Sequence, residues 1–206
     1  MKIGIIGAGG HAKVVADIAR FLEYDEIYFF DDVNKTNEIK SLGKYVGKIN
    51  NAYQFKDIPF IVAIGDNNLR KKFFLKLEEK KIKIISLIHP SSYVSEFAKI
   101  GKGSVVMPKS VINISVKISK SCIINTSSSI DHDTIINQFS HICPGVNLAG
   151  GVKIGKNTLV GIGTKVIPNI NIGSNVIIAA GSTVYKNIKS NKVFYNNHES
   201  TIYEKK

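Results

Sequence analysis

Two histidines in the second half of the chain have neighbours that suit acid–base chemistry. His132 lies between Asp131 and Asp133, and flanking carboxylates stabilise the protonated ring and bring its pKa close to neutrality. Such a histidine can act as a general base, although a solvated surface histidine would show the same neighbours. His141 is the second histidine. A metal site shared by the two is disfavoured because the sequence offers no third ligand nearby.

A glycine-rich loop near the N-terminus is the second candidate site. Gly7-Ala8-Gly9-Gly10-His11-Ala12 joins an apolar run to a segment with helical spacing. Glycines in this context let the backbone approach a phosphate or a sugar at the start of a helix. Asp31 and Asp32 lie about twenty residues further along, where an acidic residue can bind a ribose hydroxyl. A tight turn without a ligand is the alternative.

Two features favour a nucleotide sugar over NAD as the ligand of this loop. The segment before the repeats described below has only about 88 residues, half of a full dinucleotide-binding fold. His11 also places an imidazole where a pyrophosphate would have to pack tightly. A nucleotide sugar needs the same glycines and acidic pair without the second half. A nicotinamide-dependent oxidoreductase is therefore disfavoured.

An unbroken six-residue repeat must position the two histidines. Every sixth residue from 88 to 184 is Ile, Val or Leu, seventeen positions in all, and most are followed four residues later by a small or β-branched side chain. Such a period predicts a parallel β-helix, in which stacked coils bury a common aliphatic column. With Ile130 and Ile136 pointing inward, His132 faces outward at a corner and His141 lies on the outer surface. A purely structural solenoid is the alternative.

Strands and helices alternate before the repeats, which predicts a small Rossmann-like α/β domain with a parallel sheet. We expect strands at residues 2–7, 26–31, 60–65 and 81–88, and helices at 12–22 and 67–80. Residues 33–58 are polar and mixed, and no element is assigned to them. Because proline favours an extended neighbour, His89-Pro90 marks a natural hinge. The expected units are an α/β domain at 1–88, a β-helix at 89–190 and a C-terminal tail at 191–206.

The composition limits the classes of partner. A formal net charge of +12 suits nucleic acid, an anionic membrane or polyphosphate ligands, but the lysines are scattered without a basic stripe, so no nucleic-acid partner is expected. No apolar run reaches the roughly 18 residues of a membrane span, and no signal peptide is recognised, which favours a cytoplasmic protein. Cys122 and Cys143 do not make a disulfide framework.

Several segments together resemble the nucleotide-amino-sugar N-acetyltransferases of the hexapeptide-repeat acyltransferase superfamily. They are the glycine loop with its histidine, Asp31-Asp32, residues 63–70, residues 125–133 and residues 139–141. The sialic acid O-acetyltransferases are similar in architecture. The resemblance covers residues 1 to about 190. It implies a left-handed β-helix with three repeats to each triangular coil, and a homotrimer with its active sites between adjacent β-helices.

The resemblance also implies roles for individual residues. The nucleotide-linked amino sugar would contact Gly9, Gly10, His11, Asp31, Asp32, Gly65 and Asn125. His132 would be the catalytic base, and Asp133 would modulate it. The co-substrate acetyl-CoA would run along the β-helix beside His141, Gly150, Ile162 and Ala180.

We therefore predict transfer of an acetyl group from acetyl-CoA to the 4-amino group of a UDP- or dTDP-linked 4-amino-4,6-dideoxyhexose, in surface polysaccharide or glycan biosynthesis. The amine attacks the thioester directly, His132 takes its proton, and a backbone N–H such as that of Gly150 stabilises the oxyanion. No metal is implied. A sialic acid or sugar O-acetyltransferase stays an alternative, as does a non-catalytic nucleotide-sugar-binding protein.

Overall fold

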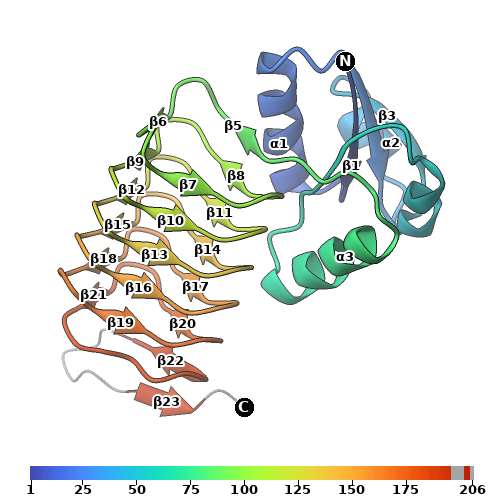
Figure 1. Ribbon diagram of the computed structural model, residues 1–206. Helices are drawn as coiled ribbons and strands as arrows, with labels where there is room; N and C mark the ends of the chain where they lie inside the picture. The colour runs from blue at the N-terminus through green and yellow to red at the C-terminus, as the bar shows by residue number, and fades with distance from the viewer. Residues whose placement is uncertain (196–201, 205–206) are drawn as a thin grey trace.

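A small α/β domain comes first, and a three-sided column of short strands follows it (Figure 1). The computed structural model describes residues 1–195 and 202–204. The α/β domain contains a four-stranded parallel sheet in the order β3-β2-β1-β4. Its strands are β1 (Lys2–Ile6), β2 (Glu26–Phe30), β3 (Lys44–Gly47) and β4 (Phe60–Val62), and its helices are α1 (Gly10–Phe21), α2 (Thr36–Ile39), the 3₁₀ helix η1 (Ile49–Gln54) and α3 (Asn67–Glu79).

Helices cover both faces of this sheet. Ile5 of β1 packs in one cluster with Ile18 of α1, whereas the next residue, Ile6, packs in a second cluster with Phe74 of α3. Successive side chains of a strand point to opposite faces, so α1 and α3 lie on opposite sides of the sheet. Burial on both faces explains why β1 is apolar over four consecutive residues. The predicted small α/β domain with a parallel sheet is confirmed.

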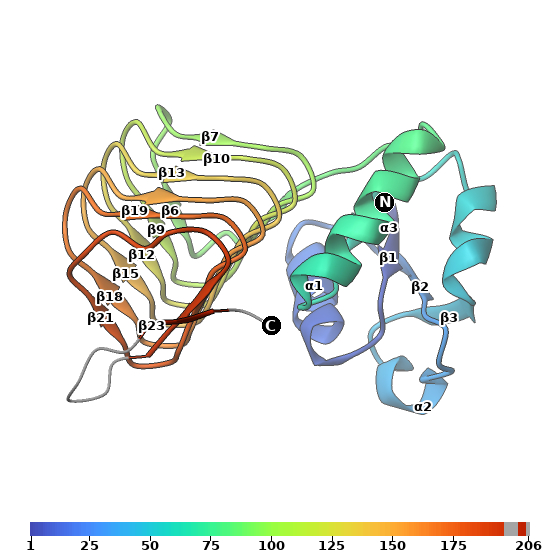
Figure 2. The same cartoon turned by 90° about the horizontal axis from the view of Figure 1, so that it is seen from below.

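The column has three sheets, one on each side, which form a triangle in cross-section (Figure 2), and their strands are parallel except for the last strand of the first sheet. The first face consists of β5 (Leu87–Ile88), β8 (Val105–Val106), β11 (Ile123–Ile124), β14 (His141–Ile142), β17 (Leu159–Val160), β20 (Ile177–Ile178), β22 (Lys192–Phe194) and the antiparallel β23 (Ile202–Glu204). The second face consists of β6 (Tyr93–Val94), β9 (Val111–Ile112), β12 (Ser129–Ile130), β15 (Asn147–Leu148), β18 (Lys165–Val166) and β21 (Thr183–Val184). The third face consists of β7 (Lys99–Ile100), β10 (Lys117–Ile118), β13 (Ile135–Ile136), β16 (Lys153–Ile154) and β19 (Asn171–Ile172).

Three corners join these faces in every coil. The first corner leads from the first face to the second, the second corner leads from the second face to the third, and the third corner returns to the first. Every sixth residue from 103 to 181 has a positive φ, and many of these corner residues are Gly or Asn, which tolerate that conformation. Asp133 (φ 59°) and Phe139 (φ 63°) also belong to this series. The predicted left-handed parallel β-helix is confirmed.

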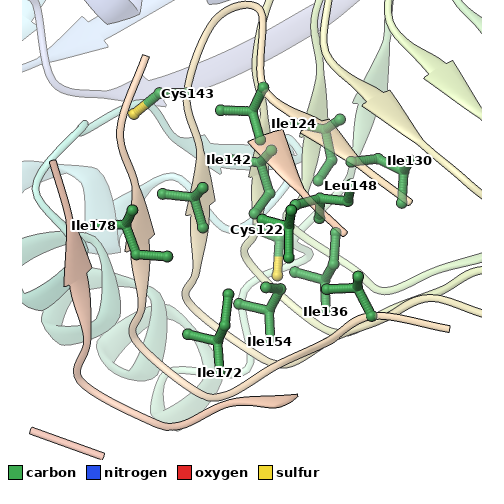
Figure 3. Close-up of a cluster of buried hydrophobic side chains, with 14 of the residues drawn as sticks. Cys122, Ile124, Ile130, Ile136, Ile142, Cys143, Leu148, Ile154, Ile172 and Ile178 are labelled. Carbon is green, nitrogen blue, oxygen red and sulfur yellow. The ribbon is translucent and has the colours of Figure 1, made fainter. Parts of the chain in front are cut away.

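The inward column of aliphatic side chains fills the β-helix (Figure 3). Ile124, Ile130, Ile136 and Ile142 have no exposed surface, and the small side chain of Cys122 packs among them. A two-residue strand cannot bury its own inner face, so each coil depends on its neighbours for this core. The predicted core positions are confirmed, although Ile88 and its two successors in the first coil are only partly buried.

One strand expected from the sequence belongs to a different sheet. Residues 81–88 do not add a strand to the α/β sheet, since only Ile84 pairs with β4, through an isolated bridge to Phe60. Leu87–Ile88 forms β5, which pairs in parallel with β8 because the coils stack in that register. The fourth strand of the α/β sheet is instead β3, within the unassigned residues 33–58. The division of the chain at residue 88 stays a prediction.

The α/β domain packs against the first face and the third corner of the β-helix (Figures 1 and 2). Val105 and Met107 of the β-helix are buried in one cluster with α1. Phe139, at the third corner, is buried in a second cluster with α3, and its ring makes an edge contact with that of Phe74, with 5.6 Å between centroids. Glu78 of α3 also pairs with Lys102 and Lys120, each at 2.8 Å. The two parts therefore share their cores.

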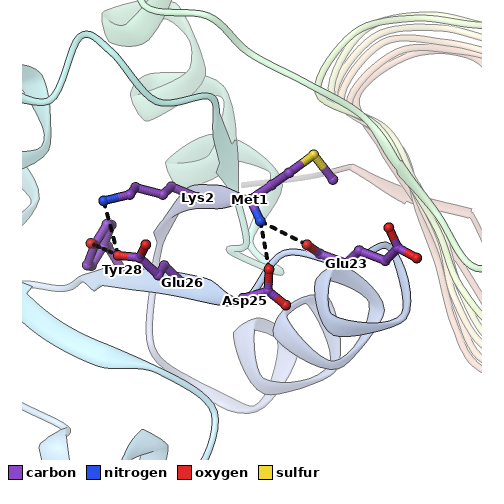
Figure 4. Close-up of polar contacts among 6 residues, drawn as sticks. All are labelled: Met1, Lys2, Glu23, Asp25, Glu26 and Tyr28. Atoms are coloured by element: carbon purple, nitrogen blue, oxygen red, sulfur yellow. Dashed lines mark hydrogen bonds and ion pairs between the residues drawn. The ribbon is translucent and has the colours of Figure 1, made fainter.

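Charged side chains surround the start of the α/β sheet (Figure 4). The amine of Met1 donates to the Asp25 carboxylate at 2.8 Å and to the Glu23 carbonyl at 3.0 Å. Lys2 pairs with Glu26 at 3.2 Å. These groups are largely exposed, and exposed ion pairs contribute little to stability.

The β-helix continues past the last repeat position. Phe194 of β22, within residues 191–206, is fully buried, and β22 pairs in parallel with β20. β23 pairs with β22 in the antiparallel direction. The rest of the expected tail, 196–201 and 205–206, lies outside the described residues. Among those that are described, no helix combines the length and apolarity needed to cross a membrane.

Candidate active site

A pocket of about 470 Å³ lies at the carboxyl ends of β1, β2 and β4. It is the place where parallel α/β sheets bind ligands, because the loops that follow the strands meet there. Six residues predicted to bind the nucleotide sugar line this one pocket: Gly9, Gly10, His11, Asp31, Asp32 and Gly65. The structure therefore brings the glycine loop and the acidic pair together.

The glycine loop is shaped by close backbone contacts. Gly7 has φ +105°, and a Cβ at this position would lie 2.8 Å from the Ala63 carbonyl oxygen, so only glycine fits. Gly9 is the N-cap of α1 and no side chain caps the helix, which leaves amide N–H groups at its first turn. The first turn of α1 carries no acidic residue. Backbone donors and the helix dipole there favour an anionic group.

The two aspartates after β2 have different roles in this geometry. Both carboxylate oxygens of Asp31 accept backbone hydrogen bonds, from Ala8 N at 2.8 Å and from Val33 N at 2.9 Å. Asp31 therefore fixes the glycine loop to the end of β2. Asp32 accepts one bond, from Ile49 N at 3.1 Å through Oδ1, and its Oδ2 has no partner among the described residues. Asp32 is the better acceptor for a ligand hydroxyl.

A short series of polar side chains leads from the pocket to the β-helix. The rings of His11 and His141 have centroids 6.5 Å apart, and Asn125 Nδ2 lies 3.0 Å from His141 Nε2. Asn125 Oδ1 accepts from Thr126 N at 2.8 Å, so its amide group must donate to the histidine. His141 Nε2 is then the acceptor, and the ring proton is on Nδ1. Gly65, His11, Asn125 and His141 thus meet between the two parts of the chain.

Both histidines of this series are held neutral. Burial, and next the positive charge of Arg70, lower the pKa of His141 to about 3. The same two causes lower the pKa of His11 to about 4. His141 Nδ1 and His11 Nε2 are buried and make no hydrogen bond of good geometry among the described residues, although the Gly65 backbone lies near enough to His141 to oppose part of the fall in its pKa. Buried polar atoms normally have partners, so these two nitrogens are suited to contact a ligand or an ordered water.

The proposed base lies at a different place, the second corner between β12 and β13. His132 Nδ1 and Asp133 Oδ2 are 2.8 Å apart, and the left-handed backbone of Asp133 turns its carboxylate back toward the ring. This hydrogen bond, followed by the charge of Asp131, raises the pKa of His132 above its usual value. With Nδ1 donating to the carboxylate, Nε2 is free to accept a proton. The side chain of His132 is 57% exposed, so a substrate could reach it.

Gly150 lies directly against the His132 ring, one coil further along the β-helix. A Cβ at Gly150 would be 2.5 Å from His132 Cε1 and 2.6 Å from Nε2, a spacing that real side chains do not show. The Gly151 N–H donates to the His132 carbonyl at 2.9 Å, whereas the Gly150 N–H makes no hydrogen bond within the described residues. A free backbone donor therefore adjoins the proposed base.

The residues expected beside acetyl-CoA do not gather in one place in this chain. Ile162 and Ala180 stack at the first corner, where Gly181 N donates to the Ile162 carbonyl at 2.7 Å, and Ile162 is 59% exposed. His141 is on the first face near this corner. Gly150 is at the second corner, one face away. A single chain thus separates His132 and Gly150 from the pocket and from His141.

Several pocket residues were missed by sequence reasoning. Lys35, Leu69, Lys72 and Phe73 also line it, and a Cβ at Gly9 would be 4.0 Å from Lys35 Nζ. Two cations beside an open helix N-terminus suit a diphosphate. Two features of the sequence could have indicated these cations: Lys35 comes shortly after Asp31-Asp32, and Lys72 is on the helix that follows the third predicted strand. Within the described residues, no three His, Cys, Asp or Glu side chains form a group that could hold a metal.

An α/β domain followed by a left-handed β-helix of hexapeptide repeats defines a hexapeptide-repeat transferase. Two family models agree with this class: the PglD N-terminal domain matches residues 2–77, and the bacterial transferase hexapeptide (six repeats) matches residues 151–186. The chain is 32% identical to the acetyltransferase domain of PglB from Neisseria gonorrhoeae FA1090, which was solved with acetyl coenzyme A. That match covers 97% of this chain and 98% of the other, with a TM-score of 0.88.

Two further relatives define the family more closely. A single-residue mutant of perosamine N-acetyltransferase from Caulobacter crescentus, solved with CoA and GDP-perosamine, is 31% identical over 98% of this chain and 97% of its own, with a TM-score of 0.90. UDP-N-acetylbacillosamine N-acetyltransferase of Bacillus subtilis (strain 168) is 36% identical over 112 residues, which are 51% of this chain and 50% of that protein. The chain belongs to the sugar N-acetyltransferase family of the hexapeptide-repeat superfamily.

Proposed function

We propose that this protein transfers an acetyl group from acetyl-CoA to the 4-amino group of a nucleotide-linked 4-amino-4,6-dideoxyhexose. The observation that carries the proposal is that His11, which lines the pocket, lies beside His141 and Asn125 of the β-helix. The pocket beside the α1 N-terminus and Lys35 suits a nucleotide diphosphate, and His11 at its edge adjoins His141 and Asn125. A sugar that extends from the diphosphate toward Asn125 would therefore reach the β-helix beside the first corner.

The chemistry requires three groups close to the acceptor amine: a base, a hydrogen-bond donor to the oxyanion, and the thioester. We assign His132 Nε2 as the group that takes the amine proton, while its Nδ1–H donates to Asp133. The amine forms a C–N bond to the acetyl carbonyl, and the Gly150 N–H stabilises the oxyanion that develops there. Collapse breaks the C–S bond, and the proton held by His132 passes to the CoA sulfur. The reaction is complete without a covalent enzyme intermediate.

This assignment requires a second copy of the chain. His132 lies between β12 and β13, at the second corner, and these strands lie away from the α/β domain (Figures 1 and 2), whereas the pocket belongs to the α/β domain. The base could reach the acceptor amine only if the second corner of one copy meets the pocket of another. We therefore propose a closed homotrimer, in which each site combines the pocket, Asn125 and His141 of one copy with His132 and Gly150 of its neighbour.

The catalytic proposal is tested by acetyl-CoA consumption against a panel of UDP-, dTDP- and GDP-linked 4-amino sugars. A sugar that carries a hydroxyl in place of the amine separates N-acetylation from O-acetylation. We expect turnover with at least one amino sugar and a loss of about a hundred- to ten-thousand-fold in kcat for His132→Ala. Acetylation of the hydroxyl sugar alone would favour the O-acetyltransferase. Because the reaction consumes acetyl-CoA, we propose the cytoplasm as its location.

The shared site is tested by mixing two variants, one defective in the base and the other defective in the pocket at low sugar concentration. His132→Ala lacks the base and Asp32→Ala lacks the hydroxyl acceptor of the pocket. After dissociation and reassembly together, the mixture should recover about a quarter of wild-type activity at low sugar concentration, because that share of sites pairs an intact pocket with an intact base. Mixing without reassembly is the control. No recovery in reassembled trimers would place both functions within one chain.

A further inference from the structure

Arg70 is a buried guanidinium at the junction of the two parts of the chain. It lies in the first turn of α3, and only 1% of its surface is exposed. On the α/β side, Nη1 donates to the carbonyls of Ile64 at 3.1 Å and Gly65 at 3.0 Å, and Nη2 donates to Asn67 Oδ1 at 2.7 Å. On the other side, Arg70 reaches the third corner of the β-helix.

At that corner, the same side chain holds two backbone segments. Nε donates to the Ser121 carbonyl at 3.0 Å, and Nη2 donates to the Phe139 carbonyl at 2.8 Å, with the Ser140 carbonyl at 3.4 Å. All five N–H donors of Arg70 are therefore used, three within the α/β domain and two on the β-helix. A planar, fixed fork is suited to such a task, which a lysine could not perform.

Arg70 lacks the counterion that such burial normally brings. It forms no ion pair within the described residues. Burial lowers the pKa of Arg70 to about 10, so the side chain stays charged at neutral pH. Burying an unpaired charge is costly, and an apolar side chain of similar size would fill the junction at lower cost. Packing alone does not explain a charge at this position.

The groups that Arg70 holds adjoin both halves of the proposed site. Gly65, whose carbonyl accepts from Arg70, is one of the residues that line the pocket. Phe139 and Ser140 directly precede His141, and Phe139 has the left-handed φ of 63°, which a bulky side chain rarely adopts. One guanidinium therefore fixes the pocket and the segment that carries His141. Burial is the main cause of the lowered pKa of His141 and of His11, and the charge of Arg70 adds to it. Asp66 and Cys122 are the other titratable groups that act on Arg70.

We propose that Arg70 is a positioning residue that holds the nucleotide pocket of the α/β domain in fixed register with His141 and Asn125 on the β-helix. Its role in acetyl transfer rests on the function proposed above. Arg70 need not contact either substrate. It acts through Gly65 on one side and through the Phe139–Ser140 segment on the other, and its charge adds to burial in keeping the neighbouring imidazoles neutral.

Two substitutions separate the charge of Arg70 from its geometry. Arg70→Met removes both, and Arg70→Lys keeps the charge but loses the five-donor fork. Glu78→Gln is the matched control, because it weakens another contact between α3 and the third corner, the ion pairs with Lys102 and Lys120, and removes none of the hydrogen bonds to Gly65, Phe139 or Ser140 that Arg70 makes. For each protein, kcat and the KM for the amino sugar are measured, and thermal unfolding gives the fraction of protein that is folded. The pKa values of the histidines are measured by NMR in a titration downward from pH 7.

We expect kcat/KM for the amino sugar to fall about tenfold or more in both Arg70 variants, and to stay within about twofold in Glu78→Gln. A loss of folded protein alone would lower kcat and leave KM unchanged, so a raised KM identifies mispositioning. The apparent pKa of His141 should rise by about one unit in Arg70→Met and stay low in Arg70→Lys. Folded Arg70 variants with wild-type kcat/KM, or losses equal to the unfolded fraction, overturn the proposal.

The experiment stays decisive if a variant or the proposed function fails. Should Arg70→Met not fold, Arg70→Lys provides the kinetic test. Should the wild type acetylate no amino sugar, the proposed function is wrong, and Arg70 is tested by calorimetric binding of UDP and by the histidine titration. Weaker UDP binding in Arg70→Lys than in Glu78→Gln then supports the positioning role. Equal binding, with an unchanged titration in Arg70→Met, overturns it.

Discussion

Gly150→Ala tests whether the backbone beside His132 controls the proposed base. The added Cβ would lie 2.5 Å from Cε1 and 2.6 Å from Nε2 of His132, whereas ordinary contacts are 3.4–4 Å. The ring must therefore move by about 1 Å, since the Cβ is fixed to the coil. His132 is more than half exposed, so the ring can swing toward solvent instead of straining the β-helix.

The size of the effect follows from this displacement. Moving the ring weakens its 2.8 Å hydrogen bond to Asp133 and turns Nε2 away from the acceptor amine. A misplacement of about 1 Å costs about a hundredfold in rate, which is within the range that a general base contributes. The Gly150 N–H is retained in alanine, so the oxyanion donor is not lost. We expect kcat to fall about a hundredfold while the free energy of unfolding changes by about 0.5 kcal/mol or less.

The assay is steady-state acetyl transfer by Gly150→Ala, His132→Ala and the double variant. In the His132→Ala background the ring is absent and the new methyl group has space, so the double variant should match His132→Ala. This non-additivity is the signature of two residues that act as a unit. The reasoning is refuted if Gly150→Ala keeps activity within about threefold of wild type, or if the double variant loses a further hundredfold beyond His132→Ala.

Three further outcomes are expected. Ile130→Asn buries an unsatisfied amide in the aliphatic column and should lower the free energy of unfolding by about 3 kcal/mol in thermal or chemical denaturation; wild-type melting would contradict the inward column. Asp133→Asn removes the main cause of the raised His132 pKa, so the fall of kcat/KM on acidification should begin at a lower pH than in the wild type. If the pH at which kcat/KM falls does not change, the fall belongs to another group, such as the substrate amine. Asp32→Ala should raise the KM for the amino sugar with little change in melting, whereas Asp31→Ala should also lower the melting temperature, because it releases the glycine loop.

Much of the fold could be predicted because its signals are local and repeated. A period of six identifies the β-helix without knowledge of long-range contacts, since each coil pairs with the next in the same register. β3 escaped prediction because this edge strand is only half-buried and its sequence, Lys44–Gly47, lacks an apolar run. Leu87–Ile88 looked like the end of an α/β strand, yet stacking on the following coil decides its sheet.

The part of the candidate site that follows two adjacent strands of the sheet could be predicted from the sequence. The glycine loop and Asp31-Asp32 are fixed by adjacent strands, so the sequence was enough to bring them to one pocket. The different roles of Asp31 and Asp32 could not be predicted from the sequence, because they depend on which backbone N–H groups lie next to each carboxylate in the folded protein. Arg70 was noted only as part of the family resemblance. Its importance depends on Ser121 and Phe139, which are 51 and 69 residues away along the chain.

Residue spacing within the β-helix also explains which site residues meet. One coil is 18 residues, so Gly150 stacks on His132 and Ala180 stacks on Ile162. The same arithmetic keeps His132 and Ile162 at different corners, since no number of whole coils separates them. Acetyl transfer needs a base and a thioester at one amine. If both sets of residues act, the missing proximity must come from the packing of β-helices against one another, which the period of a single chain does not encode.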